Sequence, residues 1–373
     1  EIMPSLVGSE MCIRDSLSLS RWTVAPRRRV FYDRGSRAPH DNNHTGEVQN
    51  VISRTGFLRG IAVAVGLAVA VGMAEESPVA ENPQPGLRVV EGGSVPVSAV
   101  AAPRSGAYWP GWLGPRRDGW VSDFRPPKRW PTTLTKSWQV KVGTGYGSPL
   151  VAGNRVYQHA RQGGDEVLWC FDLATGKTRW RQSYPAPFKI GGGGEYHGKG
   201  PKSSPVMADG RIFTMGITGK LIAWDAASGK RLWSRDYDAR FKKSHPYWGA
   251  STSPIVDEKR VIVHFGTDER GTLVALDVAT GKEIWSQGKD GPSYSSPLLV
   301  DIQGVRQVVE WNHRALTGVE SRTGKFLWEY PFPHVGSDQN MPTPAFHEGR
   351  VLLGGENRGI LGLEPRRQDG AWS

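Results

Sequence analysis

The stretch LVALDVATGKEIW, Leu273 to Trp285, contains the features that decide the fold. Its first half is continuously apolar, as in a strand that is buried on both faces. The carboxylate of Asp277 can then accept backbone N–H groups at the start of a turn. Gly281 suits the positive φ that closes a hairpin, and Trp285 offers a large face for packing. The stretch therefore predicts a strand, a turn and a returning strand.

The same pattern occurs five times along the chain. In each copy a tryptophan follows an acidic residue after eight positions: Asp172 and Trp180, Asp225 and Trp233, Asp277 and Trp285, Glu320 and Trp328, Glu364 and Trp372. The acidic residues lie 53, 52, 43 and 44 positions apart, which is the repeat length of propeller blades rather than of helical solenoids. We expect each tryptophan to pack between neighbouring blades.

The residue two positions before each acid is small: Cys170, Ala223, Ala275, Gly318 and Gly362. Cys170 is therefore interpreted as a packed small residue rather than a reactive thiol. Since Cys12 is the other cysteine of the chain and lies in an atypical leader, no internal disulfide is predicted.

A second signal recurs upstream of each copy, where Ser-Pro or Thr-Pro precedes a strand, at Pro149, Pro205, Pro254, Pro297 and Pro344. Each unit therefore contains four strands: two after the proline, one that ends at the acid and one that starts at the tryptophan. The composition includes 47 Gly, 27 Pro and 15 Trp and shows no long amphipathic helical pattern. We predict an all-β fold, a β-propeller of four-stranded blades with about five blades present.

The two ends of the repeat region do not match. Trp138 has no turn motif of its own before it, and we expect it to form a strand that completes the last blade of a closed ring. Trp372 already provides a final strand for the fifth copy. Residues 105–373 are therefore predicted to be a C-terminally truncated part of a longer propeller.

The N-terminal third divides into three predicted segments. Residues 1–50 read as a non-native or disordered leader, since EIMPSLVGSEMCIRDS resembles translated sequencing-adapter read-through; a native basic tail is the alternative. Residues 51–74 carry Arg54 and Arg59 before the apolar run Ile61–Met73, the pattern of a secretory signal peptide. Residues 75–104 are rich in Pro and Gly and are expected to be a disordered linker. The protein is therefore predicted to be periplasmic or secreted, with no integral membrane span after signal cleavage.

The formal net charge of +11 does not predict nucleic-acid binding. Residues 1–74 contain nine Arg and six Asp or Glu, so part of the excess lies outside the repeats. The remaining basic residues are scattered, without a basic stripe interleaved with aromatics. We expect no nucleic-acid partner.

The pattern A-x-D-x-x-T-G-x-x-x-W, formed by Ala275, Asp277, Thr280, Gly281 and Trp285, resembles the tryptophan-docking repeat of the pyrroloquinoline-quinone (PQQ) propeller family. The resemblance covers about residues 109–372 and implies complete rings of seven or eight blades. It also implies two kinds of function, because the family contains PQQ-dependent alcohol dehydrogenases and non-catalytic members.

The resemblance implies specific motifs in the dehydrogenases, namely an adjacent cysteine pair, a calcium site near the quinone and an aspartate base. This sequence has no Cys-Cys pair and no CxxCH haem motif, and none of the ligands can be matched residue by residue. We therefore assign no catalytic residue and no metal ligand, and the cofactor-binding residues stay unknown.

Three groups of residues are weighed as sites. Lys189–Pro205 has the spacing of a phosphate loop, but Gly200 replaces the hydroxyl residue; His197 and Tyr196 could instead line a pocket there. Five histidines recur at blade-scale separations and are interpreted as structural rather than as a metal site: His245, His264, His313, His334 and His347. The cluster Glu310, Trp311, Asn312 and His313 follows a strand and is our first candidate for a ligand site.

The expected function is that of an exported PQQ-like β-propeller which acts as a binding or scaffold module without catalysis and without a cofactor. Its partner would be a protein, a peptide or a glycan. The alternative is a PQQ-dependent alcohol or sugar dehydrogenase that uses PQQ with Ca²⁺.

Overall fold

A computed structural model describes residues 107–121, 124–192, 194–334 and 339–373. The predicted leader, signal peptide and linker all lie outside these residues. Within them no helix is long and apolar enough to cross a membrane.

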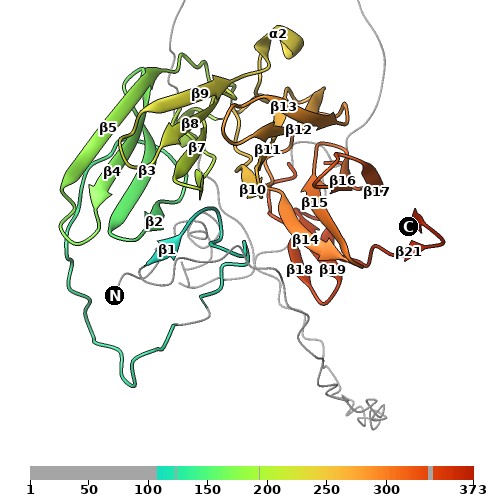
Figure 1. Ribbon diagram of the computed structural model, residues 1–373, viewed down its shortest axis with the longest axis horizontal. Helices are drawn as coiled ribbons and strands as arrows, with labels where there is room; N and C mark the ends of the chain where they lie inside the picture. Colours follow the sequence, from blue (N-terminus) through green and yellow to red (C-terminus); the bar gives the residue numbers. More distant parts are fainter. Residues whose placement is uncertain (1–106, 122–123, 193, 335–338) are drawn as a thin grey trace, which may run out of the picture. The chain divides into compact units, whose positions relative to one another are not determined.

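The described chain forms consecutive antiparallel sheets, each drawn in one span of the colour bar in Figure 1 because its strands follow one another in sequence. Blade 1 contains β1 (Tyr108–Trp109), β2 (Leu150–Ala152), β3 (Arg155–Gln162), β4 (Asp165–Asp172) and β5 (Thr178–Pro185). Blade 2 contains β6 (Val206–Ala208), β7 (Arg211–Met215), β8 (Leu221–Asp225) and β9 (Arg231–Arg235). Blade 3 contains β10 (Ile255–Asp257), β11 (Arg260–Gly266), β12 (Gly271–Asp277) and β13 (Glu283–Gln287).

Blade 4 contains β14 (Leu298–Ile302), β15 (Val305–Trp311), β16 (Ala315–Glu320) and β17 (Phe326–Pro331). Blade 5 contains β18 (Ala345–His347), β19 (Arg350–Gly355) and β20 (Gly359–Leu363), and a separate hairpin of β21 (Arg367–Gln368) and β22 (Ala371–Trp372) follows. Two single turns, η1 (Glu195–His197) and α2 (Asp238–Phe241), are the helices of the described residues. The predicted all-β fold of four-stranded blades is confirmed.

The repeated turn has the predicted hydrogen bonds. In blade 3, Asp277 Oδ1 accepts the N–H of Thr280 at 2.8 Å and its hydroxyl at 2.7 Å. These bonds favour the ionised carboxylate and lower the pKa of Asp277. Gly281 has φ +65°, a backbone conformation that glycine adopts at no steric cost. The acid and the glycine are thus both used in closing the hairpin.

In blades 1 to 3 the tryptophan packs on the turn glycine of the following blade, as predicted, whereas a Cβ atom added to Gly370 would meet nothing within 4 Å. A Cβ atom added to Gly281 would lie 2.7 Å from the Trp233 ring, and one added to Gly324 would lie 2.7 Å from Trp285. The indole Nε1 of Trp233 also donates to Val278 O at 3.1 Å. These contacts join blade 2 to blade 3 and blade 3 to blade 4.

The predicted fourth strand of blade 5 is wrong. Trp372 pairs with Arg367 in the terminal hairpin instead of pairing with β20. In the other copies the turn glycine follows the acid by four residues, whereas here Gly370 follows Glu364 by six. Asp369 and Gly370 both have positive φ and make a two-residue turn. The displaced glycine therefore closes a different hairpin.

Trp138 behaves partly as predicted. Its ring packs on Gly176 of blade 1 and its Nε1 donates to Leu173 O at 2.9 Å, which are the contacts of a docking tryptophan. The predicted strand around it is wrong, because residues 132–143 belong to no strand. A strand needs a hydrogen-bonded neighbour, and none of the described segments pairs with this one.

In blades 1 to 4, the serine of each Ser-Pro pair comes just before the inner strand of its blade, which is β2, β6, β10 or β14. These serines connect successive blades. The N–H of Ser148 donates to Ser204 Oγ at 2.9 Å, that of Ser204 to Ser253 Oγ at 3.0 Å, and that of Ser253 to Ser296 Oγ at 3.0 Å. The Ser-Pro signal thus has an added role: besides preceding a strand, Ser204, Ser253 and Ser296 each accept a backbone N–H of the preceding blade.

Residues 107–121, here called the N-terminal strap, run along the inner strands. The segment β1 pairs with β2 of blade 1, and Pro110 O accepts the N–H of Met207 from blade 2 at 2.7 Å. Further on, Trp112 Nε1 donates to Thr343 Oγ1, just before blade 5, at 2.9 Å. The strap therefore contacts segments far apart in sequence.

Candidate functional site

A groove of about 290 Å³ lies between blades 3 and 4. Its walls are Leu273 and Val319, with Phe326 at 43% exposure near the opening. Its other lining residues are polar or glycine: His264, Gln287, Gly288, Lys289, Asp290, Glu310, Asn312, Thr317 and Glu329. A mixed lining of this kind can contact both the apolar and the hydrogen-bonding parts of a ligand.

A buried histidine and a buried carboxylate meet in this groove. His264 lies near the end of β11 in blade 3, and Glu310 lies on β15 in blade 4; both are less than 5% exposed. Nδ1 of His264 contacts Glu310 Oε1, and Nε2 contacts Asp290 O at 2.9 Å. The pair therefore crosses the boundary between the two blades.

The partners of His264 determine where its protons lie. Asp290 O can only accept, so Nε2 must carry a hydrogen. One further proton then lies between Nδ1 and Glu310, either on the imidazole or on the carboxyl group. In both cases the pair has no net charge. It can thus present hydrogen-bonding atoms to the groove without an uncompensated buried charge.

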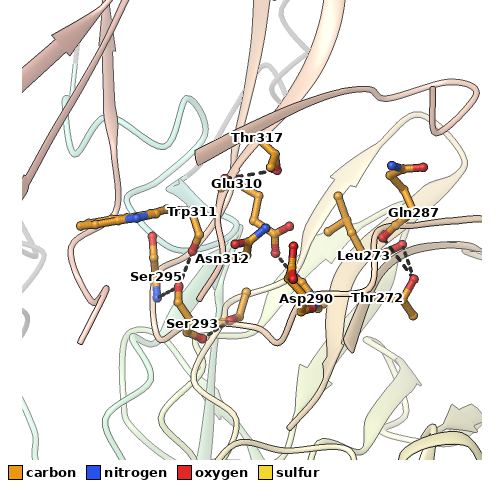
Figure 2. Close-up of polar contacts among 12 residues, drawn as sticks. Thr272, Leu273, Gln287, Asp290, Ser293, Ser295, Glu310, Trp311, Asn312 and Thr317 are labelled. Atoms are coloured by element: carbon orange, nitrogen blue, oxygen red, sulfur yellow. Dashed lines mark hydrogen bonds and ion pairs between the residues drawn. The ribbon is translucent and has the colours of Figure 1, made fainter. Parts of the chain in front are cut away.

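One oxygen of this pair is left for a ligand. Glu310 Oε1 is used by His264, whereas no described residue donates to Oε2. Asn312, beside it in the groove, uses its Oδ1 to accept the N–H groups of Arg314 and Ala315 at 2.8 and 2.9 Å. Figure 2 shows Glu310, Asn312 and Asp290 gathered on one side of the strand.

The predicted cluster of residues 310–313 is divided by the structure. Glu310 and Asn312 line the groove, but Trp311 points the other way (Figure 2) and its Nε1 donates to Phe332 O at 3.0 Å. His313 packs edge-on against His334, with ring centroids 4.3 Å apart. Burial lowers the pKa of His313, and the neighbouring imidazole of His334 lowers it further. Half of the cluster therefore belongs to the site.

The other predicted histidines do not converge. His245 contacts Pro246 O, and His347 is an exposed residue at the end of β18 in blade 5, beside Glu348. In the described ranges no three His, Cys, Asp or Glu residues gather into a group that could hold a metal ion.

In the glycine-rich segment 189–205, Gly191 and Gly192 contact the aromatic side chain of Tyr247. The N–H of Gly192 donates to Tyr247 Oη at 2.8 Å, and a Cβ atom added to Gly191 would lie 2.2 Å from the Tyr247 ring. Only the 3₁₀ turn η1 follows, where a phosphate loop would continue into an α-helix. Gly191 is thus needed for packing against Tyr247. His197 packs edge-on against Tyr146, with centroids 6.5 Å apart; the Tyr196 side chain lies outside the description.

A second buried histidine was not identified from the sequence. His159 on β3 is fully buried, and Tyr184 Oη lies 3.3 Å from its Nε2. Tyr184 Oη also donates to Glu166. Glu166 Oε1 accepts the N–H of Ile217, in the connection between β7 and β8 of blade 2, at 2.8 Å. His159 and His264 each lie four residues after an arginine that pairs with the repeat acid. This shared offset was the available signal.

The described residues do not fit the cofactor site that the family's dehydrogenases imply. Calcium prefers several carboxylate and amide oxygens at one point, and no such acidic group is present in the described ranges. His264 and Glu310 are engaged with each other.

Relatives of both functional kinds are similar to this chain. Over 157 residues it is 32% identical to outer membrane protein assembly factor BamB of Kangiella koreensis, covering 42% of this chain and 36% of the relative. Over 140 residues it is 32% identical to quinohemoprotein alcohol dehydrogenase ADH IIB of Pseudomonas putida, covering 35% of this chain and 20% of the relative. The chain thus spans well under half the length of either relative.

The crystal structure of BamB from Moraxella catarrhalis is similar with a TM-score of 0.40 and 15% identity, over 57% of this chain and 55% of that one. The family model described as outer membrane protein assembly factor BamB matches residues 164–373. Since these residues make up more than half of the chain, the chain belongs to the PQQ_2 family of BamB-like repeats.

Proposed function

We propose that this chain is an exported binding module, a PQQ-like β-propeller that holds a segment of a protein, a peptide or a glycan without catalysing a reaction. The observation that carries this proposal is the groove between blades 3 and 4, where Glu310 Oε2 and Asn312 lie beside the apolar side chains of Leu273 and Val319. Its position between two docked blades holds these groups in place.

The chemistry of the groove supports binding. Reactive use of His264 would require a nitrogen that is free to exchange a proton with a ligand. Both of its nitrogens are engaged, one with Asp290 O and the other with Glu310. The sequence also lacks the adjacent cysteines of the family's dehydrogenases. Export is supported by the predicted signal peptide at residues 51–74.

The experiment is a binding screen of the full chain against peptide and glycan arrays. Bound ligands are then titrated against Glu310→Gln and Thr317→Tyr; the first replaces the carboxyl group by an amide and the second fills the groove. We expect both variants to weaken binding at least about tenfold, with no loss for Glu348→Gln on an exposed turn. Equal affinity in all three variants would contradict the proposal.

The second candidate is a PQQ-dependent alcohol or sugar dehydrogenase. It is favoured by the similarity to ADH IIB, whose 32% identity equals that of the BamB relative. Titration with PQQ and Ca²⁺, followed by quinone absorbance and dye-linked alcohol oxidation, separates the two functions. Saturable quinone binding with turnover would replace the binding module by an enzyme.

A further inference from the structure

An arginine of the N-terminal strap lacks a counter-ion. Arg117 has φ +55°, and its Nη1 donates to Pro254 O, at the start of the inner strand of blade 3, at 3.3 Å. Although the residue as a whole is half-buried, its Nε and Nη2 atoms are buried and donate to no described residue. A buried guanidinium with one carbonyl partner leaves most of its N–H donors without an acceptor.

The nearest carboxylate in sequence is not available to Arg117. Asp118 accepts from Arg116 Nε through Oδ2 and from the N–H of Trp120 through Oδ1, both at 2.9 Å. No ion pair of the described residues includes Arg117. Burial lowers the pKa of Arg117 to about 9, so the group is still charged at neutral pH. A buried charge of this kind calls for an anion.

The free atoms of Arg117 indicate which anion fits. In a guanidinium, Nε–H and one Nη2–H point the same way and match the spacing of the two oxygens of a carboxylate. These are the two nitrogens without partners, while Nη1 is used by Pro254 O. We propose that the start of the inner strand of blade 3 is a carboxylate-binding site, with Arg117 as the bidentate donor.

The site differs from the groove of the proposed function, so the two are tested separately. The carboxylate has two sources, a small acid or the side chain of an acidic polypeptide. Citrate and acetyl-triglutamate amide are therefore titrated by calorimetry into the full chain, with ionic strength held constant by sodium chloride. Arg117→Met removes the cation of the site, and Arg125→Met changes an exposed arginine as the control.

We expect at least one probe to bind, with affinity reduced about ten- to hundredfold by Arg117→Met and unchanged by Arg125→Met and by Glu310→Gln. Binding of citrate assigns the site to a small acid, and binding of the peptide alone assigns the same chemistry to a polypeptide. Binding of neither probe, or equal affinity of the Arg117→Met variant, would overturn the proposal.

A stability measurement makes the test independent of the choice of probe. If Arg117 is a buried charge without a partner, Arg117→Met raises the urea midpoint of unfolding in chloride buffer, because it removes that unpaired charge. An ion-paired arginine would give the opposite change. A lower midpoint for a folded Arg117→Met variant would therefore contradict the unpaired state on which the site depends.

Discussion

At the residue scale, glycine does two separate things in this protein. Gly153 and Gly281 both have positive φ, +60° and +65°, in turns of blades 1 and 3. A Cβ atom added to Gly153 would meet nothing within 4 Å, whereas one added to Gly281 would lie 2.7 Å from Trp233. The first glycine is required by backbone conformation alone, and the second also by the tryptophan that docks on it.

This pair predicts the cost of losing a docking surface. Gly153→Ala should destabilise by about 1 kcal/mol, the cost of a Cβ atom at positive φ. Gly281→Ala should lose about 1–3 kcal/mol more, because Trp233 must also move. Urea unfolding of both variants measures the difference. Equal losses would show that the tryptophan contact contributes nothing.

His159 predicts a dependence of stability on pH. Burial lowers the pKa of His159, and nearby Glu166 opposes this only in part; Tyr184 is the other titratable group in contact. The unfolded chain therefore binds the proton more readily than the folded chain does. Stability contributed by the neutral imidazole is present above the unfolded pKa of about 6.5 and is lost as pH falls below it.

We expect His159→Gln to lose less stability than the wild type between pH 7.5 and pH 5. Chemical denaturation at the two pH values measures this. Burial also lowers the pKa of His245 and His313, so part of the pH dependence should persist in the variant. An identical loss in both proteins would exclude His159 as a contributor.

At the element scale, the position of one glycine decides whether a blade gains its fourth strand. Four copies place glycine four residues after the acid and form a fourth strand, whereas Gly370 lies six residues after Glu364 and closes the β21–β22 hairpin. Pro365 directly after the acid also removes a backbone donor. The β20 edge consequently has no outer neighbour among the described strands.

A grafted turn should restore the missing pairing. Replacing residues 365–371 by LATGKTR, the sequence of residues 173–179, returns glycine to its usual offset. We expect the β20 amides that do not bond to β19 to exchange with solvent at least about tenfold more slowly, as measured by hydrogen–deuterium exchange. Pro365→Leu alone keeps the glycine at its present offset and should leave the exchange unchanged. Unprotected β20 amides in the grafted chain would contradict the argument.

At the scale of the whole molecule, the blades are held together by contacts that repeat from one to the next. Three successive serine bonds connect the inner strands of blades 1 to 4. The docking tryptophans connect the same blades through the turns. The N-terminal strap adds contacts to the inner strands of blades 1 and 2. Cohesion therefore depends on many small, equivalent contacts.

Ser253→Ala tests one of these connections. The substitution leaves the buried N–H of Ser204 without its acceptor, which should cost about 1–3 kcal/mol of unfolding free energy. Ser286→Ala, on the exposed face of β13, should stay within about 0.5 kcal/mol of the wild type. Both are measured by urea unfolding. A neutral Ser253→Ala would mean that water replaces the serine, so that the bond is not needed for cohesion.

The sequence by itself determined the blades, because each repeat carries its own strand, turn and docking residues within a few positions. Asp277, Gly281 and Trp285 could be assigned structural roles from spacing alone, and those roles are confirmed. It also pointed to Glu310 and Asn312, as polar residues at the end of a strand. Local physical chemistry was sufficient for these assignments, since a turn depends on neighbours in sequence.

Only the tertiary structure decided which distant residues meet. The pairing of His264 with Glu310 joins strands of blades 3 and 4, and the contact of Arg117 with Pro254 joins the strap to blade 3. Such pairs depend on how blades stack, which no local pattern specifies. The structure also separated Trp311 from its neighbours, because successive side chains of a strand point to opposite faces. The fold follows from local repeats, and the candidate sites follow from the contacts between them.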